Sequence, residues 1–334
     1  MTSFNAVRLH RTGNPVDVLQ IDPLESRHLA PDEVCIRVQA FALNRADWLF
    51  CRGEHYTLPK LPSRLGSECA GIVERVGGLV KSVRPGDRVC TVPFDTSGYG
   101  VQGELAVVPA AYVAPWPEGL TAIEATSVWM QYLTAYFALV EVGNVGPTDH
   151  VLVPAATSSA GLGAIQLAKK CGAKVIATTR SPCKIVPIEA VGADHVIVVG
   201  DDTDLTKEIL ALTGGLGVRL VYDPVAGSFM RRYLGALAAH ARIFIYGLLS
   251  GEPTELDIVP LVRRAAVVHP FSMFNHVRDP MQLQLGISFV LNAIRTGGLR
   301  PTIGQVFPFS RVIDAYRELD AASHFGKIVV ELPQ

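Results

Sequence analysis

The chain has 334 residues, of which 49% are hydrophobic and 18% charged, and its formal net charge is −1. This length exceeds the usual size of one hydrophobic core, so we expect two domains. The near-zero charge gives no reason to expect a nucleic acid or an anionic membrane surface as a partner, which leaves a small molecule as the expected one.

The first residues, MTSFNAVRLHRTG, lack the apolar run of a signal peptide. The longest uncharged stretch, residues 125–140, is shorter than a bilayer span of about 18–20 residues, so it predicts a buried helix. The six cysteines are scattered and include no C-x-x-C pair. This use of cysteine is typical of a cytoplasmic protein without disulfides or structural zinc.

Short β-rich runs separated by turns fill residues 5–109. Runs such as VCIRVQAFAL and CAGIVERVGG are separated by Gly-Gly and Pro-Gly turn signals. This texture predicts a compact, antiparallel, barrel-like domain. The segment PWPEG at residues 115–119 indicates its boundary, so we expect the first domain to cover residues 1–122.

Apolar strands alternate with helices over residues 123–299, the second expected domain. We expect strands at residues 151–156, 174–179, 195–200, 219–225, 241–247 and 265–271, with a helix at 162–171 after the first of them. Continuous apolar strands separated by helices indicate a parallel sheet covered on both faces.

The last stretch, residues 300–334, departs from this alternation. It predicts a loop, an amphipathic helix with Val312, Ile313, Tyr316 and Leu319 on its apolar face, and a final strand, KIVVEL. We expect this stretch to return to the first domain and complete it.

The strongest local signal is the turn TSSAG at residues 157–161, between a strand and a helix. Such a turn points backbone N–H groups and the positive end of the helix at one place, which suits a pyrophosphate. We therefore expect a dinucleotide to contact Ser158, Ser159, Ala160 and Gly161. Serines replace part of the usual glycine fingerprint, so an ordinary strand–helix turn is the alternative.

The next strand ends at Thr179, Arg180 and Ser181, with Lys184 close behind. In dinucleotide-binding sheets an acidic residue here binds the ribose of NAD, whereas a basic residue accommodates the 2′-phosphate of NADP. This chain has cations and hydroxyls at that place and no carboxylate, which predicts NADPH as the cofactor. The alternative is a solvated loop that happens to be basic.

Seven motifs follow one another over nearly the whole chain. They are NRAD at 44–47 with RGEHY at 52–56, GSECAGIVERVG at 66–77, RPGDRV at 84–89, QYLTAY at 131–136, GADHVI at 192–197, DPVAG at 223–227 and GKIV at 326–329. Their order resembles that of the medium-chain dehydrogenase/reductase superfamily, in its zinc-independent, zeta-crystallin-like quinone oxidoreductase branch. The resemblance implies a GroES-like β-rich barrel domain, a Rossmann domain with a doubly wound parallel sheet, and a homodimer.

The resemblance also bears on metals. Zinc-dependent members of the superfamily place Cys, His and Cys where this chain has Asn44, Ser67 and Gln131. Asparagine, serine and glutamine are poor substitutes for thiolate and imidazole ligands, so we expect no metal. Acceptors that need no metal Lewis acid are quinones and α,β-unsaturated carbonyl compounds, because their conjugation spreads the developing negative charge.

By the same resemblance, the catalytic candidates are Asn44, Tyr56 and Gln131. His55 is an alternative to Tyr56, since one extra residue separates Gly53 from the tyrosine, and Tyr56 could instead be a loop aromatic that packs against prolines. The remaining cofactor-binding candidates are Thr134, Tyr246, Gly247 and Phe271.

Three functions remain open on the sequence. The first is a quinone or enone reductase that uses NADPH. The second is an enoyl-thioester reductase with the same fold and cofactor. The third is a structural or regulatory protein that binds NADPH without physiological turnover.

Overall fold

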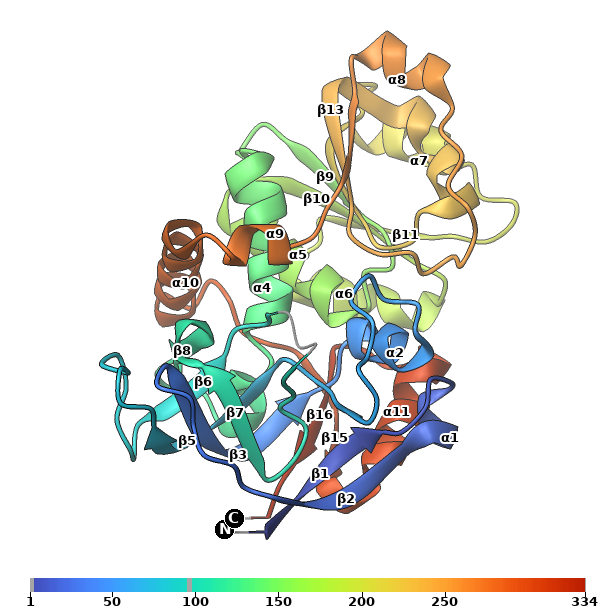
Figure 1. Ribbon diagram of the computed structural model, residues 1–334. Helices are drawn as coiled ribbons and strands as arrows, with labels where there is room; N and C mark the ends of the chain where they lie inside the picture. The colour runs from blue at the N-terminus through green and yellow to red at the C-terminus, as the bar shows by residue number, and fades with distance from the viewer. Residues whose placement is uncertain (1–2, 95–97, 334) are drawn as a thin grey trace. The chain divides into compact units, whose positions relative to one another are not determined.

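The computed structural model describes residues 3–94 and 98–333. The chain forms two compact units: unit 1 comprises Met1–Met130 and Arg300–Gln334, and unit 2 comprises Gln131–Leu299 (Figure 1). The domain boundaries expected near residues 122 and 300 stay a prediction.

Unit 1 contains two β-sheets. A three-stranded antiparallel sheet has the order β2-β1-β4, and a seven-stranded sheet has the order β15-β16-β3-β5-β6-β8, with β7 also paired to β3. The strands are β1 (Ser3–Leu9), β2 (Leu19–Glu25), β3 (Glu33–Ala42), β4 (Ser63–Arg64), β5 (Cys69–Val76), β6 (Arg88–Thr91), β7 (Leu105–Pro109), β8 (Val113–Pro115), β15 (Ile303–Pro308) and β16 (Lys327–Glu331). Strand β3 is buried over most of its length because β5, β7 and β16 all pair with it.

The helices of unit 1 are α1 (Pro15–Val18), α2 (Arg45–Arg52), η1 (Ala110–Tyr112), α3 (Ala122–Ala125), η6 (Phe309–Arg311) and α11 (Val312–Ala321). Most of them are short, and the two longer ones are α2 and α11. The chain runs from β15 through α11 to β16, so these two strands are parallel and depart from the antiparallel pattern expected for this part. The final strand pairs with β3, as expected for KIVVEL.

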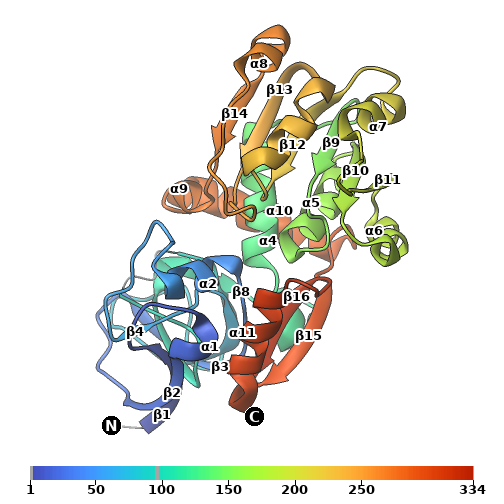
Figure 2. The same ribbon diagram turned by 90° about the vertical axis from the view of Figure 1, so that its right-hand side faces the viewer.

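Helix α11 lies against β15 and β16, as the red segment of Figure 2 shows. Its side chains Val312, Ala315, Tyr316 and Leu319 are buried, a spacing of three and four residues that places them on one helix face. Ile313, which we expected on this face, is partly buried at the margin of the same core.

Unit 2 is built on a six-stranded parallel sheet with the order β11-β10-β9-β12-β13-β14. The strands are β9 (His150–Val153), β10 (Lys174–Thr179), β11 (His195–Val198), β12 (Val218–Asp223), β13 (Leu237–Ile245) and β14 (Val267–Pro270). Numbered along the chain, this order is 3-2-1-4-5-6, the doubly wound Rossmann arrangement, which binds dinucleotides where the strand order reverses. The reversal falls between β9 and β12.

Helices precede, connect and follow these strands. They are α4 (Trp129–Ala135), which begins in the last residues of unit 1, the π-helix η2 (Tyr136–Val142), α5 (Ser159–Lys170), η3 (Pro182–Lys184), α6 (Ile185–Val191), α7 (Leu205–Leu212), η4 (Gly227–Arg232), η5 (Leu234–Ala236), α8 (Ile258–Arg264), α9 (Phe274–Val277) and α10 (Pro280–Arg295). The first strand ends three residues earlier than expected and the helix after it begins three residues earlier, because residues 154–157 form the turn. Within the described residues, no helix is long and apolar enough to cross a membrane.

Candidate functional site

The turn between β9 and α5 has a well-defined local geometry. Ala155 takes the left-handed backbone conformation, with φ of 47°, whereas Ser158 has φ of −69°. The serine that replaces a fingerprint glycine is therefore unstrained. Its Oγ accepts a hydrogen bond of 3.1 Å from the N–H of Gly161 and caps the helix. The turn directs the start of a 12-residue helix toward the carboxyl edge of the sheet.

Gly161 is required by close packing. A Cβ on this residue would lie 2.9 to 3.1 Å from backbone atoms of Ala156, so α5 can approach the turn only with glycine there. Gly163 lies two positions further along on the buried side, where a Cβ would approach the side chain of Gln131 to 3.3 Å. The helix therefore packs against the turn on one side and against α4 on the other.

The end of β10 carries the cationic side chain predicted for it. Thr179 is buried, and its Oγ1 accepts a 3.2 Å hydrogen bond from the N–H of Ser181, which shapes the turn after the strand. Arg180 is exposed, and it has no hydrogen bond or ion pair with any residue that the structure describes. Lys184 is half-buried at the end of η3. A guanidinium without a counter-charge is thus present at this edge.

Aromatic side chains lie at the ends of the neighbouring strands. The ring of Tyr246 stacks on that of Tyr222 with the centroids 4.0 Å apart. Burial raises the pKa of Tyr246, and the nearby side chains of Ser158 and Tyr222 oppose part of that increase. The structure therefore brings together Tyr246 and Ser158, two of the predicted cofactor-binding residues. Gly247 follows at once, where a Cβ would lie 2.8 Å from the carbonyl oxygen of Pro224.

Two other candidates of unit 2 lie in its interior. Phe271 is 6% exposed and packs edge-to-face on Phe244. Thr134 is 7% exposed, and its hydroxyl lies 3.2 Å from the sulfur of Met273. Both positions fit a role in packing as well as a contact with a cofactor. Gln131 is also buried, in α4.

Asp223 had no predicted role, although it ends a strand at the same edge. Its carboxylate accepts hydrogen bonds from the hydroxyl of Tyr233 at 2.6 Å and from the N–H groups of Val225 and Ala226 at 2.7 and 3.1 Å. Burial raises the pKa of Asp223, and these three donors oppose the increase. The carboxylate thereby holds the loop after β12 in place. In the sequence, this residue could have been found by its position, since it is an acidic residue directly after an apolar run.

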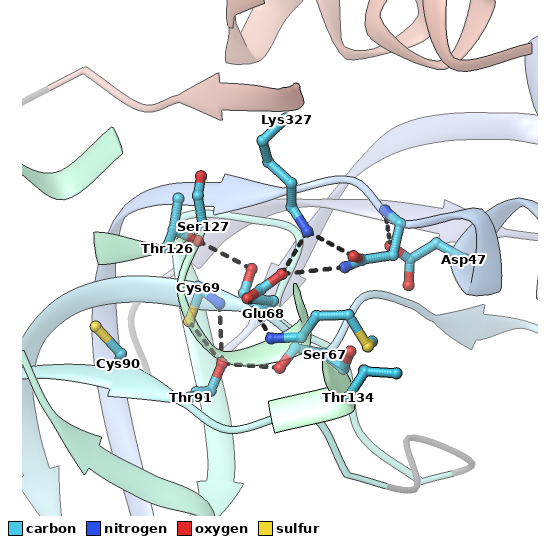
Figure 3. Close-up of polar contacts among 12 residues, drawn as sticks. Asp47, Ser67, Glu68, Cys69, Cys90, Thr91, Thr126, Ser127, Thr134 and Lys327 are labelled. Atoms are coloured by element: carbon cyan, nitrogen blue, oxygen red, sulfur yellow. Dashed lines mark hydrogen bonds and ion pairs between the residues drawn. The ribbon is translucent and has the colours of Figure 1, made fainter. Parts of the chain in front are cut away.

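Unit 1 contains a buried polar cluster formed by Asn44, Asp47, Glu68 and Lys327. Figure 3 labels Asp47, Glu68 and Lys327. The Nζ of Lys327 donates to Oδ1 of Asn44 at 2.6 Å and to Oε2 of Glu68 at 2.8 Å. The Nδ2 of Asn44 donates to the same Glu68 oxygen at 3.3 Å. The other Glu68 oxygen accepts the N–H of Met130 at 2.8 Å.

Three elements bring these side chains together. Asn44 precedes α2, Glu68 precedes β5, and Lys327 is the first residue of β16. The carboxylate of Asp47 accepts the backbone N–H of Asn44 at 2.9 Å and closes the start of α2. Burial raises the pKa of Asp47 to about 7, although that hydrogen bond and the charge of Lys327 act in the opposite direction. Asp47, Glu68 and Lys327 stand in the sequence motifs, but none of them had a predicted role.

The two remaining candidates of unit 1 differ in burial. Tyr56 is 65% exposed, and its ring lies against that of His55 with the centroids 3.9 Å apart, so the structure keeps both aromatic candidates at one place. Ser67 is buried, and its carbonyl oxygen accepts a 2.8 Å hydrogen bond from the hydroxyl of Thr91 (Figure 3). Among the described residues, no group of three or more His, Cys, Asp or Glu side chains could hold a metal ion.

Segments of both units match families of known proteins. Residues 30–118 match the family described as alcohol dehydrogenase GroES-like domain, and residues 160–293 match the family described as zinc-binding dehydrogenase. The crystal structure of an NAD-dependent alcohol dehydrogenase has 30% sequence identity and a TM-score of 0.89, covering 98% of this chain and 100% of that one. The Escherichia coli quinone oxidoreductase complexed with NADPH has 27% identity and a TM-score of 0.89, covering 98% and 99%.

The chain belongs to the medium-chain dehydrogenase/reductase superfamily, in its quinone oxidoreductase-like branch. Unit 1 has the GroES-like fold and unit 2 the Rossmann fold, as predicted from the sequence. The chain also resembles part of a much longer protein. It is 30% identical over 322 residues to a phenolphthiocerol/phthiocerol polyketide synthase of Mycobacterium tuberculosis, a match that covers 96% of this chain and 14% of that protein.

Proposed function

We propose that the protein is an NADPH-dependent, metal-independent reductase that acts on a quinone or an α,β-unsaturated carbonyl compound. The observation that carries the proposal is Arg180, an exposed guanidinium at the end of β10 with no polar partner among the described residues. A planar guanidinium suits the 2′-phosphate that distinguishes NADPH from NADH. Thr179, Ser181 and Lys184 would complete this phosphate pocket.

The turn after β9 would hold the pyrophosphate. The N–H of Gly161 is used by the Ser158 cap, which leaves the N–H groups of Ser159 and Ala160 in the first turn of α5 without an acceptor in the helix. These donors, with the positive end of a 12-residue helix, suit a dianionic group. Thr134, Tyr246, Gly247 and Phe271 are the proposed contacts to the rest of the cofactor.

When bound, NADPH supplies the hydride. The side chains of Gln131 and Tyr56 are proposed to donate hydrogen bonds to the oxygen of the acceptor, on which negative charge develops. Asn44 can act in the same way, because its Nδ2 group uses one N–H on Glu68 and has a second N–H to donate. Lys327 would fix the orientation of this amide through Oδ1.

We propose that no metal takes part, because Asn44, Ser67 and Gln131 stand where zinc-dependent members carry their ligands. Metal analysis of purified, active protein tests this directly. About one zinc per chain, lost together with activity on chelation, would contradict the proposal.

The resemblance to a polyketide synthase segment favours a second candidate, an enoyl-thioester reductase. One experiment separates the candidates: initial rates of NADPH oxidation with a panel of quinones, an enone and a crotonyl thioester. We expect the quinones to give the highest kcat/KM. A preference for the thioester would favour the second candidate. Binding of NADPH without turnover of any acceptor would favour a structural or regulatory protein.

We also propose that two copies associate through the edge of the parallel sheet in unit 2. Strand β14 is last in the strand order, and Val267 on it is 47% exposed. Helix α8 exposes Ile258, Val259 and Val262 nearby along the chain. An edge strand with exposed apolar side chains invites pairing. The proposed compartment is the cytosol, which suits a chain whose six cysteines are all free thiols.

A further inference from the structure

Unit 1 contains a cavity of about 280 Å³ that shares no residue with the Asn44 cluster. One part of its lining is apolar, and another part is formed by arginines. The apolar side chains are Phe4, Leu24, Leu105 and Val107, and the arginines are Arg8, Arg27, Arg64 and Arg75. Such a combination is typical of sites for ligands with an apolar body and a few polar groups.

Arg8 and Arg64 are the unusual members of this lining. Each uses one terminal nitrogen on a backbone carbonyl: Nη2 of Arg8 donates to Pro62 at 2.9 Å, and Nη2 of Arg64 donates to Leu105 at 2.7 Å. The Nε atoms of both are enclosed and have no hydrogen-bond partner. Over residues 3–94 and 98–333, neither guanidinium has a carboxylate within ion-pair distance. Two cations therefore line the cavity without a counter-charge from any residue that the structure describes.

The two guanidiniums also repel each other. Burial, helped by the charges of Arg8 and Arg27 and opposed by Cys69 and Cys35, lowers the pKa of Arg64 from 12.5 to about 10. Arg64 therefore remains protonated at neutral pH. Concentrating positive charge in a partly desolvated place is unfavourable unless an anion compensates it.

The other charged groups in the described part of the lining do not supply this compensation. Both terminal nitrogens of Arg27 bind the carboxylate of Glu33 at 2.7 Å, so this pair is internally neutral. Arg75 contacts the sulfur of Cys35 at 3.6 Å and lies 3.9 Å from an oxygen of Glu74. Glu74 in turn binds Arg37 more closely, at 2.6 Å. Glu25, which also lines the cavity, is exposed to solvent.

We propose that this cavity binds a small organic anion, whose carboxylate pairs with Arg8 and Arg64 and whose apolar body packs on Phe4, Leu105 and Val107. The planar fork of a guanidinium matches the two oxygens of a carboxylate. The cavity lies just below the range of about 300–1,000 Å³ that is usual for ligand pockets, so the ligand is a medium-chain or single-ring acid.

The test uses octanoate as the probe and octanamide as its uncharged counterpart, with binding to the full-length protein measured by isothermal titration calorimetry. We expect one octanoate per chain, bound at least about tenfold more tightly than octanamide, since a charge-assisted pair is stronger than a neutral one. Equal affinities for the two probes, or no heat from octanoate, would overturn the proposal.

Variants locate the bound anion. Arg64→Met should lower octanoate affinity by at least about tenfold and leave octanamide binding unchanged. Arg84→Met is the matched control, because the side chain of Arg84 is 87% exposed and lies outside the cavity lining. Val107→Phe fills the cavity while keeping both guanidiniums, so it should abolish binding of both probes.

Circular dichroism and the thermal midpoint of each variant establish that it folds. Because Arg64→Met also removes the hydrogen bond to the carbonyl oxygen of Leu105, affinities are compared at a temperature well below the midpoint of every variant. Octanoate should raise the midpoint of the wild type but not of Val107→Phe. Octanoate binding that survives both Arg64→Met and Val107→Phe would place the anion elsewhere and exclude this cavity as its site.

Discussion

The Nζ of Lys327 lies 2.8 Å from Oε2 of Glu68 in the interior of unit 1, where the two side chains are 1% and 0% exposed. An ion pair in such a place is stable only if further hydrogen bonds satisfy both partners. Here Asn44 accepts from the amine and the N–H of Met130 donates to the carboxylate. The pair therefore links the first residue of β16 to the residues before α2 and β5.

Breaking this pair from one side should be costly. We expect Lys327→Met to lower the free energy of unfolding by about 3–5 kcal/mol, because it leaves the carboxylate of Glu68 buried without a counter-charge. Denaturation by urea measures the effect. Arg300→Met is the control, since the Arg300 side chain is 78% exposed in its pair with Glu124 and should cost less than about 1 kcal/mol. Similar losses for the two variants would refute this account.

Asp47 should make stability depend on pH. Because burial raises the pKa of Asp47 from 3.8 to about 7, the folded protein binds this proton more tightly than the unfolded chain does. The stabilisation that this bound proton gives the folded state is fully present below about pH 4. It declines by up to about 1.4 kcal/mol per pH unit and is lost as the pH rises through about 7.

The measurement for Asp47 is a series of urea denaturations from pH 4 to 8. Relative to the wild type, Asp47→Asn should show a flatter profile, since its amide carries no proton to lose. Asp32→Asn, at an exposed loop position, is the control and should keep the wild-type slope. Parallel profiles for the wild type and Asp47→Asn would show that Asp47 does not titrate in this window.

Cofactor preference should depend on Arg180 and Lys184. Each charge-assisted contact to a phosphate contributes roughly 1.5–3 kcal/mol, so Arg180→Ala/Lys184→Ala should weaken NADPH binding by on the order of a hundredfold or more. NADH lacks the 2′-phosphate and should hardly respond. Fluorescence titration with both dinucleotides measures the two affinities. Equal losses would assign these residues to the fold, and a wild type that already prefers NADH would make the proposed cofactor wrong.

Gly161 should be intolerant of a side chain. In Gly161→Ala the new Cβ would lie 2.9 to 3.1 Å from the backbone of Ala156, so α5 must shift, at a cost of about 1–3 kcal/mol. Gly146→Ala is a matched control in the same unit, because a Cβ there meets no atom within 4 Å. Thermal unfolding of both variants tests the difference, and an unchanged midpoint for Gly161→Ala would contradict it.

Association through β14 should be sensitive to charge on α8. Val262 is 72% exposed, and Val262→Glu should shift the proposed dimer to monomer, since burying the new carboxylate at an interface is costly. Val186→Glu is the control, because Val186 is 73% exposed on α6. Sedimentation at micromolar concentration distinguishes the species. A monomeric wild type would remove the basis of the proposal.

Local patterns in the sequence predicted the parallel sheet of unit 2 and the buried face of α11 in unit 1, but not the parallel pairing of β15 with β16. The apolar runs along unit 2 predicted all six parallel strands, because a strand covered on both faces must be apolar throughout. The spacing of Val312, Tyr316 and Leu319 likewise predicted the buried face of α11. The turn after β9 was also predicted from its small residues, although the left-handed conformation of Ala155 was not.

The polar clusters could not be predicted in this way. Lys327 meets Glu68 and Asn44 across 259 and 283 residues of sequence, and the meeting depends on the pairing of β16 with β3. Arg8 and Arg64 likewise line one cavity only because β1 pairs with β4. The spacing of apolar residues within a segment predicts which of its residues are buried, and it can be read from that segment alone. Which charged groups share an interior depends on the register between distant strands, and that register exists only in the tertiary structure.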